Sequence, residues 1–295
     1  DIKREPAKDY NDVKSVDGIK IVHHNIFTNK IAYINMSFDT KCVPDELIPY
    51  MGLLGSTLSL MDTKNYTYPE LTNEININCG GLATGTALYS DKVDFSKNTI
   101  VYEVKSKALY EKVPFVLGMM EEIMYNTRFD DYKRLKEIIA RIKSRLEASL
   151  MGQGHSIAML ECCAQFSESA YYSDILRGYK YYEFIKKLDE EFEQNKTQIV
   201  DKLNKLVGYI FNKDNVIVSL TADDEGYDCF VKALSAKSCN IKDEHYNTAV
   251  RSFIPVNVKT GYTSASQVQY VARCGNFVKD GYKYTGALKV LKVIF

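Results

Sequence analysis

The sequence lacks a net charge, a long apolar run and an apolar leader. Its 38 basic and 38 acidic residues cancel, so it carries no electrostatic footprint for nucleic acid or for an anionic membrane. No apolar run reaches the length of about 18 residues that a transmembrane helix needs. The charged start, DIKREPAKDYNDVK, has no signal-peptide core. We therefore expect an intracellular protein, cytoplasmic or in an organelle matrix, without nucleic-acid or membrane partners.

Cysteine and histidine are not arranged as they are in disulfide frameworks or metal sites. The cysteines are odd in number and form no CxxC pair, which favours a reducing compartment. Of the four histidines, His23 and His24 are neighbours in a strand-like run, so their side chains face opposite ways and cannot share one metal. His155 and Cys162 would share a helix face, but no further ligand is spaced to complete a site there. The seven cysteines are Cys42, Cys79, Cys162, Cys163, Cys229, Cys239 and Cys274.

Catalytic motifs are also missing. The sequence has no GxSxG, GxGxxG or GxxxxGK[ST], and its CGGLATG follows a helix where a phosphate-binding loop would precede one. The acid pairs Glu121-Glu122 and Glu190-Glu191 lie among lysines and indicate solvated helix faces. The tyrosines of SAYYSD and YKYYEF fit helix interfaces better than a peptide-binding surface, which stays a second possibility.

Alternation and helical periodicity predict an α+β fold. The alternating run Ile19–Phe38 predicts two strands joined by a tight hairpin at Thr28-Asn29-Lys30. Pro44 with the acidic residues after it predicts a helix start, and Tyr68-Pro69-Glu70 a second. Strands before most of the helices predict an antiparallel sheet with helices packed on one face. Further strands are predicted at 82–92, 98–107 and 215–223, and helices from 109, from 135, and at 155–170, 173–187, 190–207 and 225–238.

A second domain is expected after residue 245. The stretch RSFIPVNVKTGYTSASQVQYVARCG contains Pro255, Gly261 and small polar residues, and then an alternating run that predicts a strand over Gln267–Cys274. The chain stops inside the apolar pattern YTGALKVLKVIF. We therefore predict one domain over 1–245 and the truncated beginning of a related domain over 246–295.

Motifs spread over the whole chain resemble one family, the pitrilysin/insulinase superfamily of zinc metallopeptidases, in its presequence-protease (falcilysin-like) branch. The resemblance implies two halves, each made of two related α+β domains of the LuxS/MPP-like metallopeptidase fold. The N-terminal half of the family carries the zinc motif HxxEH, and the C-terminal half is a degenerate copy. This chain resembles the front part of that C-terminal half. The matching segments are Asp1-Ile2, Thr28–Tyr33 (with Lys30 in place of the usual Gly), Ile48–Leu54, Met61–Thr63, Tyr66–Tyr68, Glu70-Leu71, Ile75, Gly80-Gly81, Gln153–Ala158, Val268–Ala272 and Tyr284–Leu291.

The departures from the family's pattern imply a segment without catalytic residues. Aligning Asp62-Thr63 with the family's Gly-Thr places Leu53, Ser56 and Thr57 in the slots of the first His, the Glu and the second His. Shifting the alignment by one or two residues does not help, because Pro49–Met61 contains no ligand residue. An Arg and a Tyr that the family supplies from its last domain would lie beyond Phe295.

The resemblance thus implies a non-catalytic part of a zinc metalloendopeptidase that degrades unstructured peptides. Zinc would be bound by the N-terminal half of the same chain and not by this segment, which would form part of the wall of a closed substrate chamber. Its partners would be that catalytic half and an unfolded peptide, although the sequence identifies no substrate contacts. A non-enzymatic scaffold of the same fold, like the core subunits of respiratory complexes, and a peptide-binding module remain alternatives.

Overall fold

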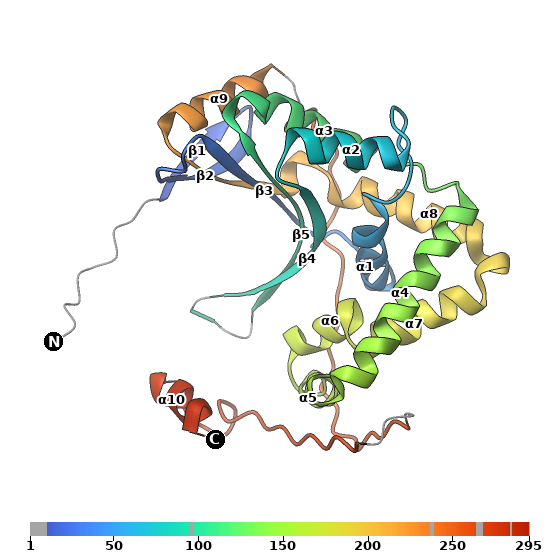
Figure 1. Ribbon diagram of the computed structural model, residues 1–295. Coiled ribbons are helices and arrows are strands. Elements are labelled where there is room, and N and C mark those ends of the chain that lie inside the picture. Colours follow the sequence, from blue (N-terminus) through green and yellow to red (C-terminus); the bar gives the residue numbers. More distant parts are fainter. Residues whose placement is uncertain are drawn as a thin grey trace.

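The computed structural model describes residues 11–91, 93–94, 97–236, 239–263, 268–283 and 285–294. A curved sheet with the strand order β1-β2-β6-β3-β5-β4 is covered by helices on one side (Figure 1). This confirms the predicted α+β class and the one-sided helical layer. The strands are β1 (Asn11–Val16), β2 (Ile19–Asn25), β3 (Ile31–Asp39), β4 (Leu82–Ser90), β5 (Asn98–Leu109) and β6 (Val216–Ala222).

The helices follow the predicted periodicity, with boundaries that local residues explain. The capping box of Thr67 and Glu70 starts α2. The predicted segment 173–187 is two helices, because the chain leaves the helical conformation at Gly178. The helices are α1 (Ile48–Thr57), α2 (Tyr68–Asn78), α3 (Val113–Tyr125), α4 (Tyr132–Gly152), α5 (Gly154–Ala164), α6 (Glu168–Arg177), α7 (Tyr179–Glu190), α8 (Phe192–Ile210), α9 (Asp224–Ser235) and α10 (Gly286–Ile294), with short 3-10 turns at Asp45–Leu47, Tyr110–Lys112 and Lys213–Asn215.

The predicted hairpin between β2 and β3 is wrong, although both strands and the turn exist. Asn29 and Lys30 have the positive φ values of 52° and 63° that the turn was expected to require. However, β6 lies between the two strands, parallel to β2 and antiparallel to β3. Residues 26–30 are long enough to cross the roughly 10 Å that separates strands on either side of a third. The sheet is therefore mixed, and not purely antiparallel as predicted.

A hairpin that the sequence analysis missed starts the sheet. β1 pairs with β2 in antiparallel fashion, and the two strands are joined by Asp17 and Gly18 with φ values of 50° and 79°. An Asp-Gly pair with two positive φ values is the turn that two-residue hairpins favour. The Asp-Gly turn is visible in the sequence VDG, but the charged residues of β1 interrupt the hydrophobic alternation that would predict a strand.

The core lies between the sheet and its helices. In β3 the side chains of Ala32, Ile34, Met36 and Phe38 are buried, while those between them are exposed or half-buried. Phe211, just after α8, packs its ring against Phe38, Tyr102 and Tyr125 at centroid distances of 5.1, 5.5 and 6.1 Å. The opposite face of the sheet carries exposed apolar side chains, among them Val13, Tyr33, Tyr89 and Ile217.

The C-terminal segment, described over 246–263 and 268–276, is extended and lies along the domain (Figure 1). The guanidinium of Arg251 donates to the carbonyl oxygens of Thr40 and Val43, and the backbone N–H of Val256 donates to the Gln165 carbonyl at 2.8 Å. The strand predicted over Gln267–Cys274 is wrong for residues 268–274, which have no regular secondary structure. An alternating run becomes a strand only beside another strand, and none of the described strands pairs with it.

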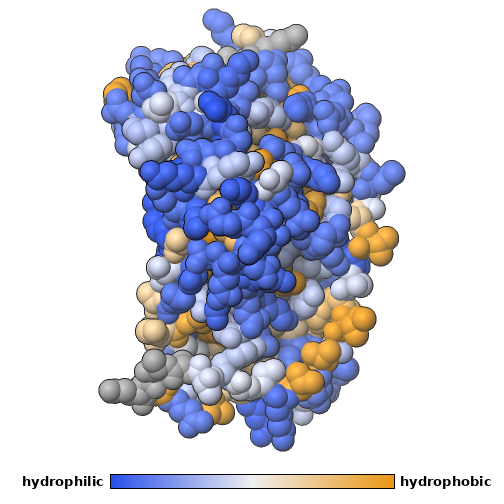
Figure 2. Space-filling view, turned by 90° about the vertical axis from the view of Figure 1, so that its right-hand side faces the viewer, coloured by the Kyte–Doolittle hydropathy of each residue, from blue (hydrophilic) through white to orange (hydrophobic). Residues whose placement is uncertain are grey.

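Some predicted features fall outside the described residues: Asp1-Ile2, the strand end at Lys92, the helix end at Lys237-Ser238, Gln267 and Tyr284. Among the described helices, none combines the length and hydrophobicity that crossing a membrane requires. The side of the molecule at the right of Figure 1 is mainly hydrophilic, and hydrophobic side chains gather in its lower part (Figure 2).

Candidate functional site

Helix α1 presents the three positions that the sequence aligns with the zinc motif. Leu53 and Thr57 are completely buried, and Ser56 between them is half-buried. The spacing i, i+3, i+4 places the three side chains on one side of the helix. The structure thus puts the three residues together, but in the core and not at an open surface.

The donors at these positions do not fit a zinc ion. The Thr57 hydroxyl donates to the carbonyls of Leu53 and Leu54 at 3.2 and 3.0 Å, and the Ser56 hydroxyl donates to Gly52 at 3.3 Å. Leu53 has no donor atom at all. Zinc in proteins takes imidazole, thiolate or carboxylate ligands, and neither a hydrocarbon nor a hydroxyl engaged with its own helix backbone replaces them.

The space beside α1 is filled by other side chains and by backbone. A Cβ atom on Gly52 would lie 2.7 Å from the Tyr181 ring, and one on Gly55 would lie 3.2 Å from the Cα of Gly85 in β4. The buried hydroxyls of Tyr102 and Tyr181 have no hydrogen-bond partner among the described residues. Burial raises the pKa of both phenols, so neither supplies a phenolate at neutral pH. The buried Tyr172 and Tyr181 support the helix-interface reading of the tyrosine-rich segments.

The turn after α1 is held by a buried carboxylate that was misread from the sequence. Glu122 was predicted to lie on a solvated face, but it is only 6% exposed. Its two oxygens accept from the backbone N–H and the side-chain amide of Asn65 at 3.0 and 2.8 Å, and from the Asn126 amide at 2.7 Å. Burial raises the pKa of Glu122, but hydrogen bonds from Thr63, Asn126 and Asn65 outweigh it, so the pKa lies below the ordinary 4.5. The carboxylate is therefore a structural anchor for residues 62–67.

The histidines take structural positions. As predicted, His23 and His24 face opposite ways: His23 is buried, with Nε2 3.0 Å from the Ala222 carbonyl, and His24 lies 3.0 Å from the Ser219 hydroxyl. His155 is exposed at the start of α5, with its ring 6.0 Å from that of Tyr270. Neither His155 nor Cys162 belongs to a group of three or more potential metal ligands among the described residues.

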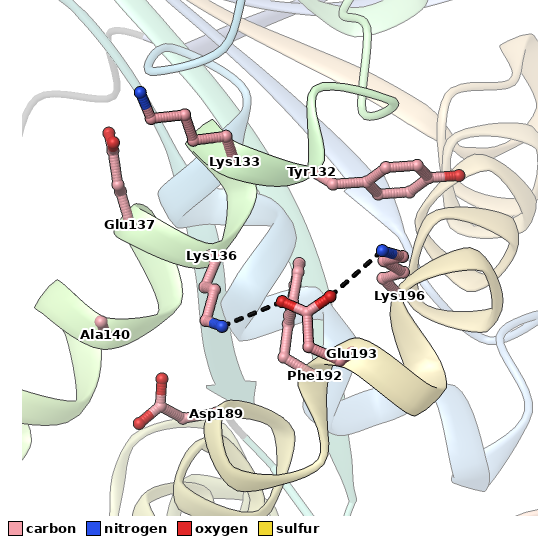
Figure 3. A pocket seen from close by; sticks show the side chains of 9 residues that line it. All are labelled: Tyr132, Lys133, Lys136, Glu137, Ala140, Asp189, Phe192, Glu193 and Lys196. Carbon is pink, nitrogen blue, oxygen red and sulfur yellow. Dashed lines mark hydrogen bonds and ion pairs between the residues drawn. The ribbon is translucent and has the colours of Figure 1, made fainter.

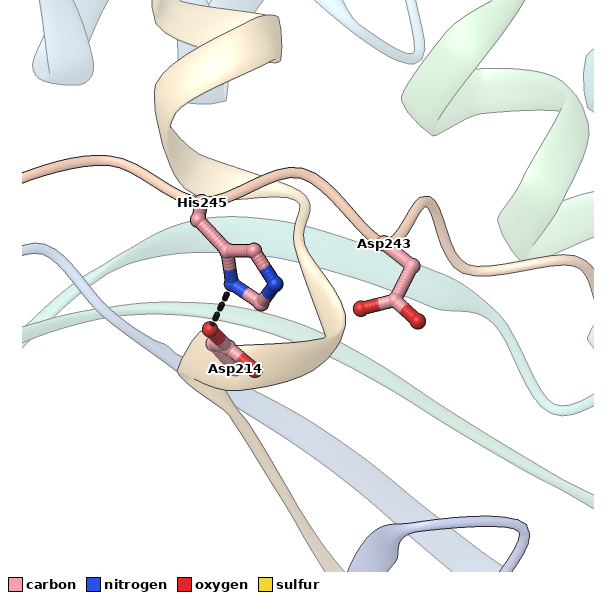
Figure 4. A group of neighbouring side chains, drawn as sticks. All are labelled: Asp214, Asp243 and His245. Atoms are coloured by element: carbon pink, nitrogen blue, oxygen red, sulfur yellow. Dashed lines mark hydrogen bonds and ion pairs between the residues drawn. The ribbon is translucent and has the colours of Figure 1, made fainter.

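One group of potential metal ligands is found on the surface of the described part. Asp214, Asp243 and His245 are all exposed, and their ligand atoms lie within 4.8 Å of one another. Nδ1 of His245 is hydrogen-bonded to the Asp214 carboxyl group, and Asp243 lies beside them without bonding to the imidazole (Figure 4). Exposed acidic groups are common on protein surfaces, so the closeness of these three side chains does not by itself indicate a metal site.

One pocket in the described part lies at the start of α4 and the corner between α7 and α8. It has a volume of about 490 Å³. Glu193 points at Lys136 and Lys196 and forms an ion pair with each, at 2.9 and 3.1 Å (Figure 3). These two lysines hold the pKa of Glu193 below its ordinary value. The sequence did not predict this pocket. Among its lining residues, the paired charges of Lys136, Glu193 and Lys196 do not form a catalytic acid, base or nucleophile. Its lining residues are Tyr132, Lys133, Lys136, Glu137, Ala140, Asp189, Phe192, Glu193 and Lys196.

Two carboxyl groups are buried together where α5, α6 and α7 meet. Glu161 and Asp174 are 8% and 0% exposed. Burial, followed by hydrogen bonding to Glu161 and its negative charge, raises the pKa of Asp174 from 3.8 to about 6. The backbone N–H of Lys180 at 3.2 Å and its ammonium at 3.7 Å favour the charged form, but they do not offset these effects. Between about pH 3.8 and about pH 6, Asp174 therefore holds a proton in the folded chain that it releases in the unfolded chain.

This proton makes stability depend on pH in a defined direction. Because the folded pKa is raised, the stabilisation is fully present below about pH 3.8 and is lost as pH rises through about 6. We expect Asp174→Asn to unfold at a higher temperature than the wild type at pH 7 and at a similar temperature near pH 4. Thermal unfolding at both pH values measures this, with the exposed Asp228→Asn as the control. Equal destabilisation by Asp174→Asn at both pH values would contradict the raised pKa of Asp174.

Comparison with known proteins identifies the family. Residues 1–188 match the family of segments associated with subfamily C of the M16 peptidases. The chain belongs to this family. The resemblance to the presequence-protease branch of the pitrilysin superfamily, and to its non-catalytic C-terminal half, is confirmed by the relatives of this M16-family chain.

Two curated relatives of the M16-family chain match it from end to end. It is 36% identical to "Protein HypA" of Clostridium perfringens, covering 100% of this chain and 30% of that protein. It is 25% identical to "Presequence protease 1, chloroplastic/mitochondrial" of Arabidopsis thaliana, covering 99% of this chain and 27% of that protein. The chain therefore spans less than a third of the length of these relatives.

Solved structures support the fold. A conserved protein from Enterococcus faecalis V583 matches 81% of this chain and 54% of its own, with a TM-score of 0.57 and 12% identity. A peptidase M16 inactive domain from Pseudomonas fluorescens matches 80% of this chain and 53% of its own, with a TM-score of 0.50 and 13% identity. The M16-family chain thus shares the fold of M16 domains, including one described as inactive.

Proposed function

We propose that this M16-family chain is a non-catalytic part of a zinc metalloendopeptidase that degrades unstructured peptides. The observation that carries the proposal is the composition of α1. Leu53, Ser56 and Thr57, which the sequence alignment sets against the zinc-motif residues, are packed in or next to the core, and the two hydroxyls bond to their own helix backbone. Zinc would be held by the N-terminal half of the same protein, which would supply the Lewis acid and the activated water.

The role of this chain would be structural, as part of the wall of a closed substrate chamber. The sheet face without a helical layer provides an exposed surface with aromatic and apolar side chains, such as Tyr33 and Tyr89. A surface of this kind contacts peptides of many sequences without fixed charge partners. The catalytic half and the unfolded peptide would be its two partners.

Residues 246–295 would begin the following, related domain. In support, Val250 and Val271 are 93% and 85% exposed, as is expected of apolar side chains that pack against chain outside this segment. The alternative, one unit over 1–295, would leave these side chains in water.

Zinc analysis of the purified 295-residue chain tests the first part of the proposal. We expect substoichiometric zinc after dialysis and no hydrolysis of an unfolded peptide. Mixing the chain with the N-terminal half of the same protein should raise peptide hydrolysis above that of the half alone. One tightly held zinc per chain would overturn the proposal, and an N-terminal half without HxxEH would favour the non-enzymatic scaffold.

A further inference from the structure

Three cysteines meet where the C-terminal segment passes α5. Cys162 and Cys163 are near the end of α5, and Cys274 lies on the extended segment 111 residues further along. The sulfur atoms of Cys163 and Cys274 are 3.4 Å apart, within hydrogen-bonding distance of each other. All three thiols are free and partly exposed, so a small redox reagent can reach them.

The same short segment contacts α5 along its length. The ring of Tyr270 occupies the space where a Cβ on Gly154 would lie, at 2.4 Å. The thiol of Cys162 lies 3.9 Å from the carbonyl of Ala272, and that of Cys274 lies 3.8 Å from the carbonyl of Met159. These contacts are weak because thiols are poor donors. A covalent bond between two of the sulfurs would attach the C-terminal segment to α5 more strongly than these hydrogen bonds do.

The sulfur–sulfur distance of 3.4 Å favours Cys163 as the disulfide partner of Cys274, and Cys162, which also interacts with Cys274, is the competing thiol. Sulfur in a disulfide is about 2.05 Å from its partner, so the pair must approach by roughly 1.4 Å, which rotation of two exposed side chains supplies. Cys162 directs its thiol to a backbone carbonyl. A bond between Cys162 and Cys163 is disfavoured because adjacent side chains on a helix diverge.

We propose that Cys163 and Cys274 form a reversible disulfide that fastens residues 270–274 to α5 when the surroundings become oxidising. The oxidant is a low-molecular-weight disulfide, RSSR, of which glutathione disulfide is the common intracellular form. The proposal is independent of the peptidase role, since it rests on the thiol geometry alone. Fastening this segment would restrict any domain that follows it.

The exchange is balanced in atoms and electrons. One cysteine thiolate attacks RSSR, forming a mixed disulfide and releasing one RS⁻. The second thiolate attacks the sulfur of the first cysteine, forming the Cys163–Cys274 bond and releasing the second RS⁻. The two cysteine protons are taken up by the two RS⁻ groups, and the two electrons of the cysteines reduce RSSR to two RSH. Excess RSH reverses both steps.

The surroundings of Cys162 and Cys274 slow their exchange with disulfides at neutral pH. Desolvation, reinforced by the hydrogen bond with Cys163, raises the pKa of Cys274, and desolvation also raises that of Cys162. The thiolate is the reactive form, so a raised pKa slows exchange at neutral pH. The pair would therefore respond to sustained oxidation, and faster as pH rises.

The test is disulfide mapping of the folded 295-residue chain after incubation with glutathione disulfide. We expect a mass loss of two hydrogens, loss of two of the seven free thiols, and one cross-linked peptide pair joining Cys163 to Cys274. Trypsin cleavage after Arg273, the residue before Cys274, should slow severalfold in the oxidised chain and recover on adding reduced glutathione.

Variants distinguish the proposed pair from its neighbours. Cys162→Ser and the distant Cys229→Ser should still form the bond, whereas Cys274→Ser should form none and keep its cleavage rate at Arg273 unchanged by oxidation. A Cys162–Cys274 or Cys162–Cys163 bond in the wild type would overturn the assignment. So would a chain that gains only stable glutathione adducts, or one that keeps seven free thiols while folded.

Discussion

Replacing Leu53 by histidine is expected to destabilise the chain by about 3–5 kcal/mol and to create no zinc site. Leu53 is completely buried in the core, so the change removes its apolar contacts and buries an imidazole without a partner. Urea unfolding measures the loss of stability. Zinc titration of the folded variant by calorimetry measures the metal affinity, which should stay as low as that of the wild type.

The stability and zinc affinity of Leu53→His together show whether position 53 is a core position or one that can hold a zinc ligand. Ser59→His, just beyond the end of α1 and only half-buried, is the matched control and should cost less than about 1 kcal/mol. A Leu53→His chain that keeps wild-type stability and binds zinc tightly would show that α1 still has the geometry of a zinc-binding helix. It would also contradict the proposed division of labour between the two halves.

Replacing Glu122 by glutamine should have the second largest effect, about 2–4 kcal/mol at pH 7. The carboxylate accepts from Asn65 and Asn126 through both oxygens. A glutamine amide turns one acceptor into a donor facing other donors, and it removes the negative charge that strengthens these bonds. The turn that follows α1 should loosen, which amide hydrogen exchange at residues 63–66 would show.

The pH dependence of this loss follows from the direction of the shift. Because the pKa of Glu122 in the folded chain lies below 4.5, its stabilisation is present above that value and is lost as pH falls through the folded pKa. The gap in stability between Glu122→Gln and the wild type should therefore narrow as pH falls through the lowered folded pKa of Glu122. Glu121→Gln is the matched control, since Glu121 bonds to Asn240 at an exposed site. Equal losses in the two variants would contradict the anchoring role.

Local patterns predicted the elements but not their neighbours. The helix start at Pro44, the capping box of α2 and the alternating strands all follow from residues within a few positions of one another. The placement of β6 between β2 and β3 depends on a strand far along the chain, at Val216–Ala222. No property of the turn Thr28–Lys30 could show that a third strand separates its arms.

The candidate site was predictable where it depends on local sequence, and the prediction failed where it depends on long-range packing. The absence of any ligand residue over Pro49–Met61 is a property of thirteen consecutive letters. The anchoring of Glu122 was missed because its pattern among lysines is that of a solvated face, and only the packing of the turn against α3 excludes water from it.

The sequence by itself determined the α+β class, the family and the lack of metal ligands in α1, because each follows from residues that are close together in the sequence. Only the tertiary structure decided the mixed sheet, the buried Glu122, the raised pKa of Asp174 and the contact between Cys163 and Cys274. Packing of the whole chain brings together groups that are far apart in the sequence, such as Cys163 and Cys274, 111 residues apart, and Lys20 of β2 and Ile217 of β6, 197 residues apart. Burial and distance set both the pKa values and the thiol contact, and neither exists until the chain has folded.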